Sequence, residues 1–238
     1  MAPFFPRGAH DKSIETWERI GAHKGPLPAA KVVHGHPITT KIKAVCRTCN
    51  NGWMSQVEQR AQPFIEPMIS GRNVVLDATA QLAVTEWIIL KIMVWECSQP
   101  EETRVYGRDQ TLEFAQTRQI AGNVQIWLLR WAGTPRRAHI TRAFTGLFLP
   151  SEVATADTRR ANTQTVLFRA GRFLFYAVHT LRPDFKLREF RQIEAKVLWP
   201  SRGPRLVWPP LKSIGSVEMR HIAYTLQRFL DRPGMNPI

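Results

Sequence analysis

The sequence contains little cysteine, which excludes a fold held together by disulfides. Only Cys46, Cys49 and Cys97 occur among the 238 residues, too few for the framework of a small secreted protein. No basic segment followed by an apolar one opens the chain, so no signal peptide is visible. The longest apolar run, residues 87–95, is interrupted by Lys91 and is too short to cross a bilayer. We therefore expect a cytoplasmic protein that does not enter the membrane.

Acidic residues are also scarce relative to basic ones. Nineteen Asp and Glu stand against 33 Lys and Arg, so the formal net charge is +14 and the pI is near 10.5. A positive field of this size favours polyanionic partners, and most of the cations are arginines, which bind phosphates and stack on bases. We expect nucleic acid, with DNA favoured, as the partner. An ordinary basic, soluble surface is the alternative.

Motifs of several large protein classes are missing as well. The sequence has no Gly-rich phosphate loop, no nucleophile elbow, no heptad array and no internal repeat. These absences argue against P-loop enzymes, α/β-hydrolases, coiled coils and repeat proteins.

The chain does contain one Cys-x-x-Cys pair, Cys46 and Cys49. Two thiols at this spacing can face one metal ion across a tight turn, and the residues that follow, Asn50, Asn51 and Gly52, suit such a turn. We expect Asn51 to cap a helix whose apolar stripe begins at Met54. Two ordinary thiols are the alternative, because a structural zinc site needs four ligands and Cys97 lies in an apolar helical pattern.

The longer string of residues 45–58, Val-Cys-Arg-Thr-Cys-Asn-Asn-Gly-Trp-Met-Ser-Gln-Val-Glu, is more specific. It resembles the second half of the motif in a bacterial and phage family related to HNH endonucleases. A looser resemblance continues through residues 82–96 and the Trp-Pro pairs at Trp199 and Trp208. It implies structural zinc, with magnesium or manganese for phosphodiester hydrolysis, and it places Asn50 near the catalytic metal. A simple turn residue is the alternative role of Asn50.

The sequence departs from that family where catalysis would occur. The family pattern has an earlier Cys-x-x-Cys and an acidic residue followed by His-x-x-Pro, and neither is found here. Either the protein is a degenerate relative, or the first half of the motif lies upstream of this chain. Both explanations predict an incomplete catalytic motif.

Two histidines and several cations precede the cysteines. His34 and His36 are close enough in sequence to complete a Cys2His2 zinc set, and His36 is the candidate general base. Surface histidines are the commoner alternative. We expect Lys41, Lys43 and Arg47 to contact nucleic acid.

The remaining pattern predicts an α+β fold: a small zinc-ribbon or treble-clef-like module, residues 1–71, followed by a larger domain, residues 72–238, of antiparallel sheet packed on a long core helix. The core helix is expected at 79–98, with Glu86 and Glu96 as possible catalytic carboxylates or members of a partly exposed face. The other expected elements are helices at 13–20, 54–69 (kinked after Ala61), 109–120 and 216–230, and strands at 38–45, 74–76, 124–131, 139–149, 163–170, 172–180 and 195–199.

These observations predict an HNH-related nucleic-acid-binding protein, a metal-dependent endonuclease whose catalytic motif is incomplete. One alternative is a non-catalytic zinc-ribbon binder of DNA or RNA. The other is an interaction protein in which the cysteine pair is incidental.

Overall fold

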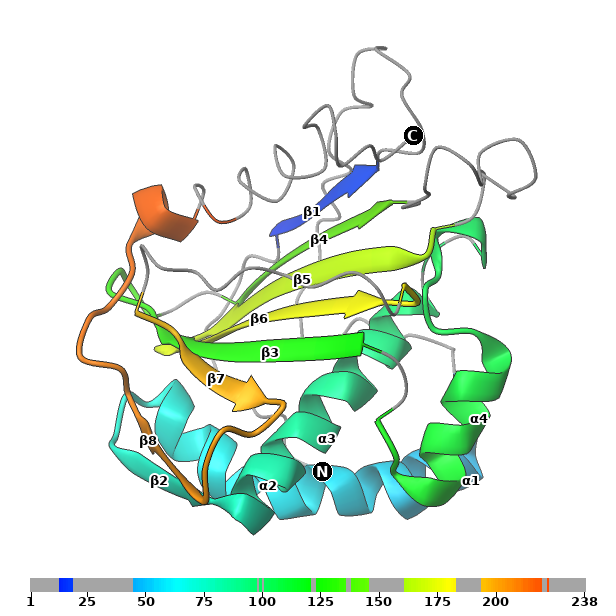
Figure 1. The fold of residues 1–238 in the computed structure, drawn as a ribbon, viewed down its shortest axis with the longest axis horizontal. Coiled ribbons are helices and arrows are strands. Elements are labelled where there is room, and N and C mark those ends of the chain that lie inside the picture. The colour runs from blue at the N-terminus through cyan, green and yellow to red at the C-terminus, as the bar shows by residue number, and fades with distance from the viewer. Residues whose placement is uncertain are drawn as a thin grey trace.

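The computed structural model describes residues 13–18, 45–97, 99, 101–120, 123–135, 138–145, 161–182, 194–219 and 222. They form an α+β fold in which helices cover one face of a mainly antiparallel sheet (Figure 1). The predicted α+β class and the predicted packing of a sheet on a long helix are confirmed. The predicted strand at 38–45 falls almost entirely outside the described residues.

Six strands form the main sheet of this described part, in the order β1-β4-β5-β6-β3-β7. All neighbours are antiparallel except β1, which is parallel to β4. The strands are β1 (Ser13–Glu18), β3 (Asn123–Arg130), β4 (His139–Thr145), β5 (Thr163–Ala170), β6 (Phe173–Thr180) and β7 (Lys196–Trp199). Five of them match the two-residue periodicity of the sequence.

The first strand corrects the sequence prediction. A helix was expected at residues 13–20, but Ser13–Glu18 is strand β1. The segment contains Ile14, Thr16 and Trp17, all residues that favour extended structure. The edge of β4 supplies the backbone partners that local sequence cannot reveal.

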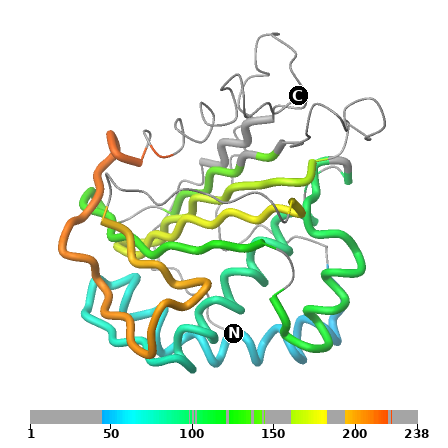
Figure 2. Tube along the Cα trace, viewed as in Figure 1, coloured from blue at the N-terminus to red at the C-terminus, as the bar shows by residue number. Residues whose placement is uncertain are grey.

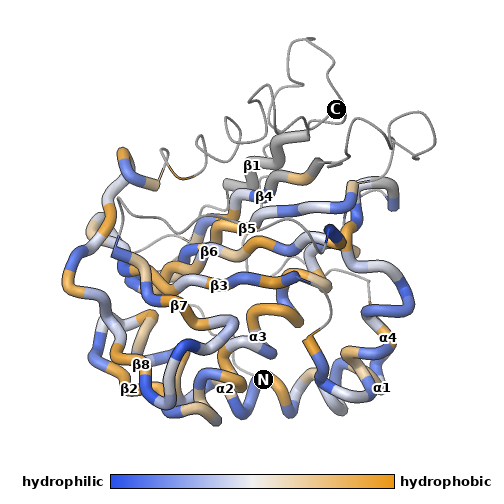
Figure 3. Tube along the Cα trace, in the orientation of Figure 1, coloured by the Kyte–Doolittle hydropathy of each residue, from blue (hydrophilic) through white to orange (hydrophobic). Residues whose placement is uncertain are grey.

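Helix α3 (Ala78–Glu96) lies under the sheet as the central core helix, as predicted. Its N-cap is Asp77, whose Oδ1 accepts the Ala80 N–H at 2.8 Å. Figure 3 shows hydrophobic residues along much of its length. The helix is long and apolar enough to cross a membrane by length and composition, but 67% of that window is buried inside the molecule, as expected of a core helix.

The helical segment at the cysteines begins earlier than predicted. It runs through α1 (Arg47–Cys49), a π-helical segment (Asn50–Met54) and α2 (Ser55–Ile69). Cys46 is the N-cap, so the prediction that Asn51 caps this helix is wrong. Helix α2 also continues through Pro63 and Pro67, where a kink was expected. The two prolines are four residues apart, on the side away from the buried stripe Val57, Ala61, Ile65 and Met68.

One hydrophobic core joins the segments on both sides of the predicted boundary at residue 71. Val57, Ala61 and Ile65 of α2 belong to the same buried cluster as α3 and the inner face of the sheet. The division into two domains itself stays a prediction, because residues 1–12 and 19–44 lie outside the described part. In Figure 2 the chain leaves α2, runs through the short strand at residues 74–77 and then enters α3 beneath the sheet.

A two-stranded ribbon of β2 (Val74–Asp77) and β8 (Arg205–Trp208) lies beside these helices. Trp208 is fully buried, and its Nε1–H donates to the Leu129 carbonyl at 3.3 Å. It therefore completes the core and does not offer a face for base stacking. β2 was predicted, whereas β8 was not.

The opposite face of the sheet carries a second cluster, which includes Trp127, Leu174 and Tyr176 and is covered by Ile214 and Ile222. Helix α4 (Arg108–Thr117) is found where a helix was predicted at 109–120. Residues 216–219 and 222 are helical, as expected, and most of the predicted final helix lies outside the described residues.

Candidate metal and nucleic-acid site

The two predicted metal-binding cysteines lie in one turn at the start of the helical segment. Cys46 has extended backbone angles, and its Sγ accepts the Cys49 N–H at 3.2 Å. This bond is the largest cause that lowers the pKa of the Cys46 thiol, followed by the Cys49 side chain. The pKa of Cys49 is raised, mainly by its hydrogen bond with the Cys46 side chain. The turn thus favours a thiolate on exposed Cys46 with a second sulfur beside it.

Four of the other predicted site residues, His34, His36, Lys41 and Lys43, lie outside the described residues. Within the described ranges, no group of three His, Cys, Asp or Glu side chains could hold a metal ion. The Cys46 and Cys49 thiols therefore fit half of a zinc site.

Asn50 and Arg47 flank the turn. Arg47 is exposed at the start of α1, where a phosphate could reach it. Asn50 is also exposed, and its Nδ2 donates to the Asn51 Oδ1 at 3.3 Å. Cys97 is half-buried at the end of α3.

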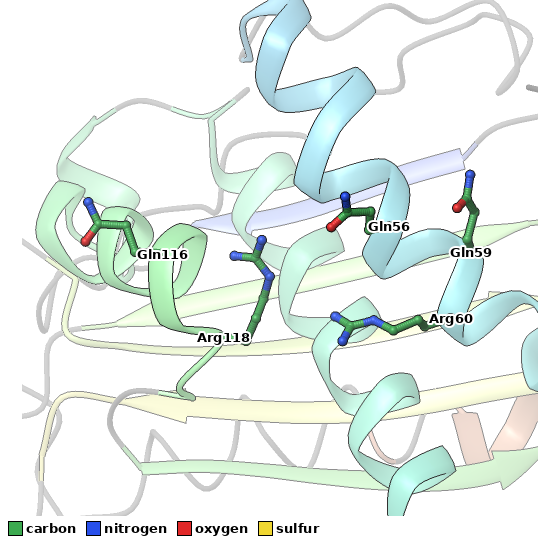
Figure 4. Close-up of a pocket in the computed structure, with 5 residues that line it drawn as sticks. All are labelled: Gln56, Gln59, Arg60, Gln116 and Arg118. Atoms are coloured by element: carbon green, nitrogen blue, oxygen red, sulfur yellow. The ribbon is translucent and has the colours of Figure 1, made fainter.

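A basic groove opens beside this turn, between α2 and the end of α4 (Figure 4). It has a volume of about 560 Å³ and is lined by Gln56, Gln59, Arg60, Gln116 and Arg118. Every side chain in this lining is an amide or a guanidinium.

One of the lining arginines is paired with a buried carboxylate that is not itself part of the lining. Arg60 Nη2 lies 2.6 Å from Glu86 Oε2, and the Glu86 side chain is only 5% exposed. Burial raises the pKa of Glu86, while the nearby Arg60 and Arg118 act in the opposite direction. Glu86 is thus the buried counter-ion of the groove, and the prediction that it belongs to a partly exposed face is wrong.

Trp53 links the groove to the cysteine turn. The guanidinium carbon of Arg118 lies 4.3 Å from the centre of the Trp53 ring, and that ring packs edge-on against Phe114 at 6.1 Å. The Trp53 side chain also lowers the pKa of the Cys49 thiol, against the net upward shift. The thiol pair and the groove are therefore parts of one local structure.

Glu96, the other carboxylate considered for catalysis, lies apart from the groove. Its side chain is 2% exposed, and its Oε1 lies 3.0 Å from Arg142 Nη2. The backbone N–H groups of Val105 and Tyr106 donate to it at 2.8 and 3.1 Å. Three structural bonds thus hold this carboxylate in place, and its burial excludes an exposed-face role.

A larger cavity of about 800 Å³ lies between the end of α3 and the start of α4. Its lining mixes both signs of charge, with Glu96, Glu101 and Asp109 against Arg104 and Arg108. It therefore has no net preference for an anion, in contrast to the groove.

Sequence reasoning missed Arg60 and Arg118. Arg60 had a usable signal, because Gln56, Gln59 and Arg60 lie on the polar side of the predicted helix. Arg118 had none, because its position follows from how α4 packs against Trp53.

The described residues define a class: an α+β protein with a thiol turn at the start of a long helical segment and a basic groove beside it. Comparisons with protein-family models, curated proteins and solved structures give no match. The relation to HNH endonucleases therefore stays a prediction based on residues 45–58.

Proposed function

We propose that this protein is an HNH-related nucleic-acid-binding protein that acts on DNA. In this proposal, the Cys46–Cys49 turn and the following helix are the second half of a zinc-ribbon or treble-clef-like module. The observation that carries the proposal is the turn itself: one sulfur accepts the backbone N–H of the other cysteine, beside a groove lined only by amides and guanidinium groups. The net charge of +14 supports the choice of a polyanion as partner.

The metal in this proposal is zinc, held by Cys46 and Cys49, with His34 and His36 as the remaining ligands. Such a zinc ion has a structural role: it ties the segment before the turn to the start of the helix. We expect weak or sub-stoichiometric zinc, because only two strong ligands are certain.

Metal analysis of purified protein tests this ligand set. Changing Cys46 and Cys49 to Ser should release the bound zinc. One tightly held zinc per chain after both His34 and His36 are changed to Ala would rule out the Cys2His2 set.

DNA binding is tested by titrating a fluorescent 20-base-pair duplex at two salt concentrations. We expect little sequence preference and a steep loss of affinity with salt, because each phosphate neutralised by a cation releases about one counterion. Absence of binding at low salt, or binding that does not depend on salt, would contradict the proposal.

Endonuclease activity is the second candidate function. It is favoured by Asn50, which follows the thiol turn directly and is exposed to solvent, as the resemblance requires of a residue near a catalytic magnesium or manganese ion. A non-catalytic zinc-ribbon binder is the competing form of the proposal. Plasmid cleavage distinguishes them.

A further inference from the structure

We propose that the groove between α2 and α4 is a phosphate-binding site that holds the phosphodiester backbone of nucleic acid, with Arg60 and Arg118 as its two cationic sides. This inference rests on the proposed function, because it names the surface through which the protein binds its partner. Arg47, the sequence-predicted nucleic-acid contact that the described residues include, is not part of the lining of this groove.

The charge balance of the groove is the first argument. Arg60 pairs with Glu86, and Arg118 lies in the field of the same carboxylate, so one of the two positive charges is left uncompensated. The two arginines also disfavour each other: burial is the main cause that lowers the pKa of Arg118, and the charge of Arg60 adds to it. An anion placed between them would relieve this repulsion.

The geometry of Arg118 is the second argument. Arg118 has a φ of 62°, in the left-handed region where a side chain such as arginine is strained. This conformation ends α4 and turns the side chain back, so that Nη1 donates to the carbonyls of Phe114 and Ala115 and the guanidinium lies on Trp53. The group is thus held at two sides, and in the described part of the chain its Nε and Nη2 make no hydrogen bond.

The direction of the side chains is the third argument. In Figure 4 the side chain of Arg60 extends from α2 toward Arg118, and both guanidinium groups point into the space between the two helices. The Arg60 side chain is 53% exposed, so a ligand can reach it while its Nη2 stays on Glu86. Pre-oriented guanidinium groups bind phosphate oxygens well, because their N–H groups match that geometry.

The shape of the groove favours a polymer backbone over a small enclosed anion. It is open, and three of its five lining residues, Gln56, Gln59 and Gln116, are exposed amides that can donate to phosphate oxygens without adding charge. It also adjoins the thiol turn through Trp53, and Arg47 is exposed in that turn. A backbone can pass from one cation to the next along this surface.

Two substitutions test the site, one expected to weaken DNA binding and the other to strengthen it. The probe is the same fluorescent duplex. Gln56→Glu adds a carboxylate to the wall and should weaken binding roughly tenfold, the size of a charge-assisted hydrogen bond. Glu86→Gln removes the competing carboxylate without changing the shape and should strengthen binding. Partial unfolding cannot produce this second result, so the pair separates the site from a general loss of structure.

Each variant has a control with the same change in net charge. Asn73→Asp adds one negative charge at the exposed turn after α2, and Glu66→Gln removes one from the exposed side of α2. Both should bind the duplex as the unaltered chain does. Inorganic phosphate, compared with chloride at equal ionic strength, forms a separate arm that reports stabilisation against heat.

The outcomes separate the site from the proposed function. Weaker binding for Gln56→Glu and tighter binding for Glu86→Gln, with unchanged controls, would establish the groove. If the unaltered chain binds DNA but all four variants bind equally, the groove is wrong and the proposed function stands. If phosphate stabilises the chain while DNA binding ignores the groove variants, the site takes free phosphate and the backbone assignment is overturned. If the unaltered chain does not bind DNA, both fail.

Discussion

At the scale of single residues, Glu96 and Arg142 form a buried ion pair. Both side chains are almost completely buried, and Arg142 also donates to the Thr103 carbonyl at 2.7 Å and to Gln164 Oε1 at 2.8 Å. A buried pair of this kind contributes little compared with an apolar replacement, but breaking it leaves an uncompensated charge.

We therefore expect Arg142→Met to lower the free energy of unfolding by about 3–5 kcal/mol at pH 7. The double variant Arg142→Met with Glu96→Gln should recover part of this loss, because no charge is left behind. Burial already raises the pKa of Glu96 in the folded state. The folded chain therefore protonates Glu96 more readily than the unfolded chain does. The loss of stability in Arg142→Met should shrink as the pH falls, because a neutral Glu96 needs no counter-ion. Urea unfolding of the unaltered chain, the two single variants Arg142→Met and Glu96→Gln, and the double variant measures this, and strictly additive losses would contradict the coupling.

His179 gives a second residue-scale prediction. It is buried and stacks on Tyr106 with a ring separation of 3.8 Å, and neither ring nitrogen has a hydrogen-bond partner among the described residues. Burial lowers its pKa from 6.5 to about 3. Between these values the unfolded chain binds the extra proton, so this group's contribution falls by about 1.4 kcal/mol per pH unit as the pH decreases.

His179→Phe keeps an aromatic ring on Tyr106 and removes the titration. The stability of the variant relative to the unaltered chain should therefore rise steadily from pH 6.5 toward pH 4 and stay constant between pH 7 and 8, where the imidazole is neutral in both states. Urea midpoints across this range test it. A difference in stability that does not vary with pH would show that folding does not lower the pKa of His179.

At the scale of elements, the helices and strands that follow from a local periodicity could be predicted from the sequence. The strands that form by pairing with a distant segment could not. The two-residue alternation from β3 to β7 and the apolar α3 are local signals, and both were confirmed. β1 and β8 pair with β4 and β2, which are far away in the chain, so their short segments carried no decisive pattern. The same holds for the site: the thiol turn is visible in residues 46–49, but the groove exists only because α4 ends against Trp53.

Gly171 tests how the elements are joined. It forms the turn between β5 and β6 with a φ of 57°, and a Cβ there would lie 2.4 Å from the Ile69 carbonyl oxygen at the end of α2. That carbonyl already accepts the Arg172 N–H at 2.9 Å. Gly171→Ala should cost about 2 kcal/mol or more, through backbone strain and a clash with main chain that cannot move aside. Gly203→Ala is the control, because a Cβ at Gly203 meets nothing within 4 Å; equal stability of the two variants would contradict this prediction.

At the scale of the whole molecule, the thiol turn is attached to a core built from apolar contacts. The helix that follows it buries Val57, Ala61 and Ile65 against α3. Changing Cys46 and Cys49 to Ser should therefore abolish zinc binding and loosen the first turn, while the main unfolding transition shifts by no more than about 1 kcal/mol. Small zinc fingers, in contrast, unfold without metal. Thermal unfolding with and without a chelator measures this, and loss of the main transition would mean that zinc organises the core as well.

Catalysis depends on which groups the whole chain brings to the turn. Hydrolysis of a phosphodiester needs a base that takes a proton from water and a metal that stabilises the departing oxygen. Asn50 can position or ligate, but an amide does not accept a proton near neutral pH, and the acidic-His-x-x-Pro segment of the resembling family has no counterpart in this sequence. We therefore expect weak plasmid cleavage or none with magnesium or manganese, under conditions in which the protein binds the same plasmid. Binding and cleavage should be measured side by side with the Asn50→Ala and His36→Ala variants. Strong cleavage that disappears in His36→Ala would overturn this expectation and identify His36 as the general base.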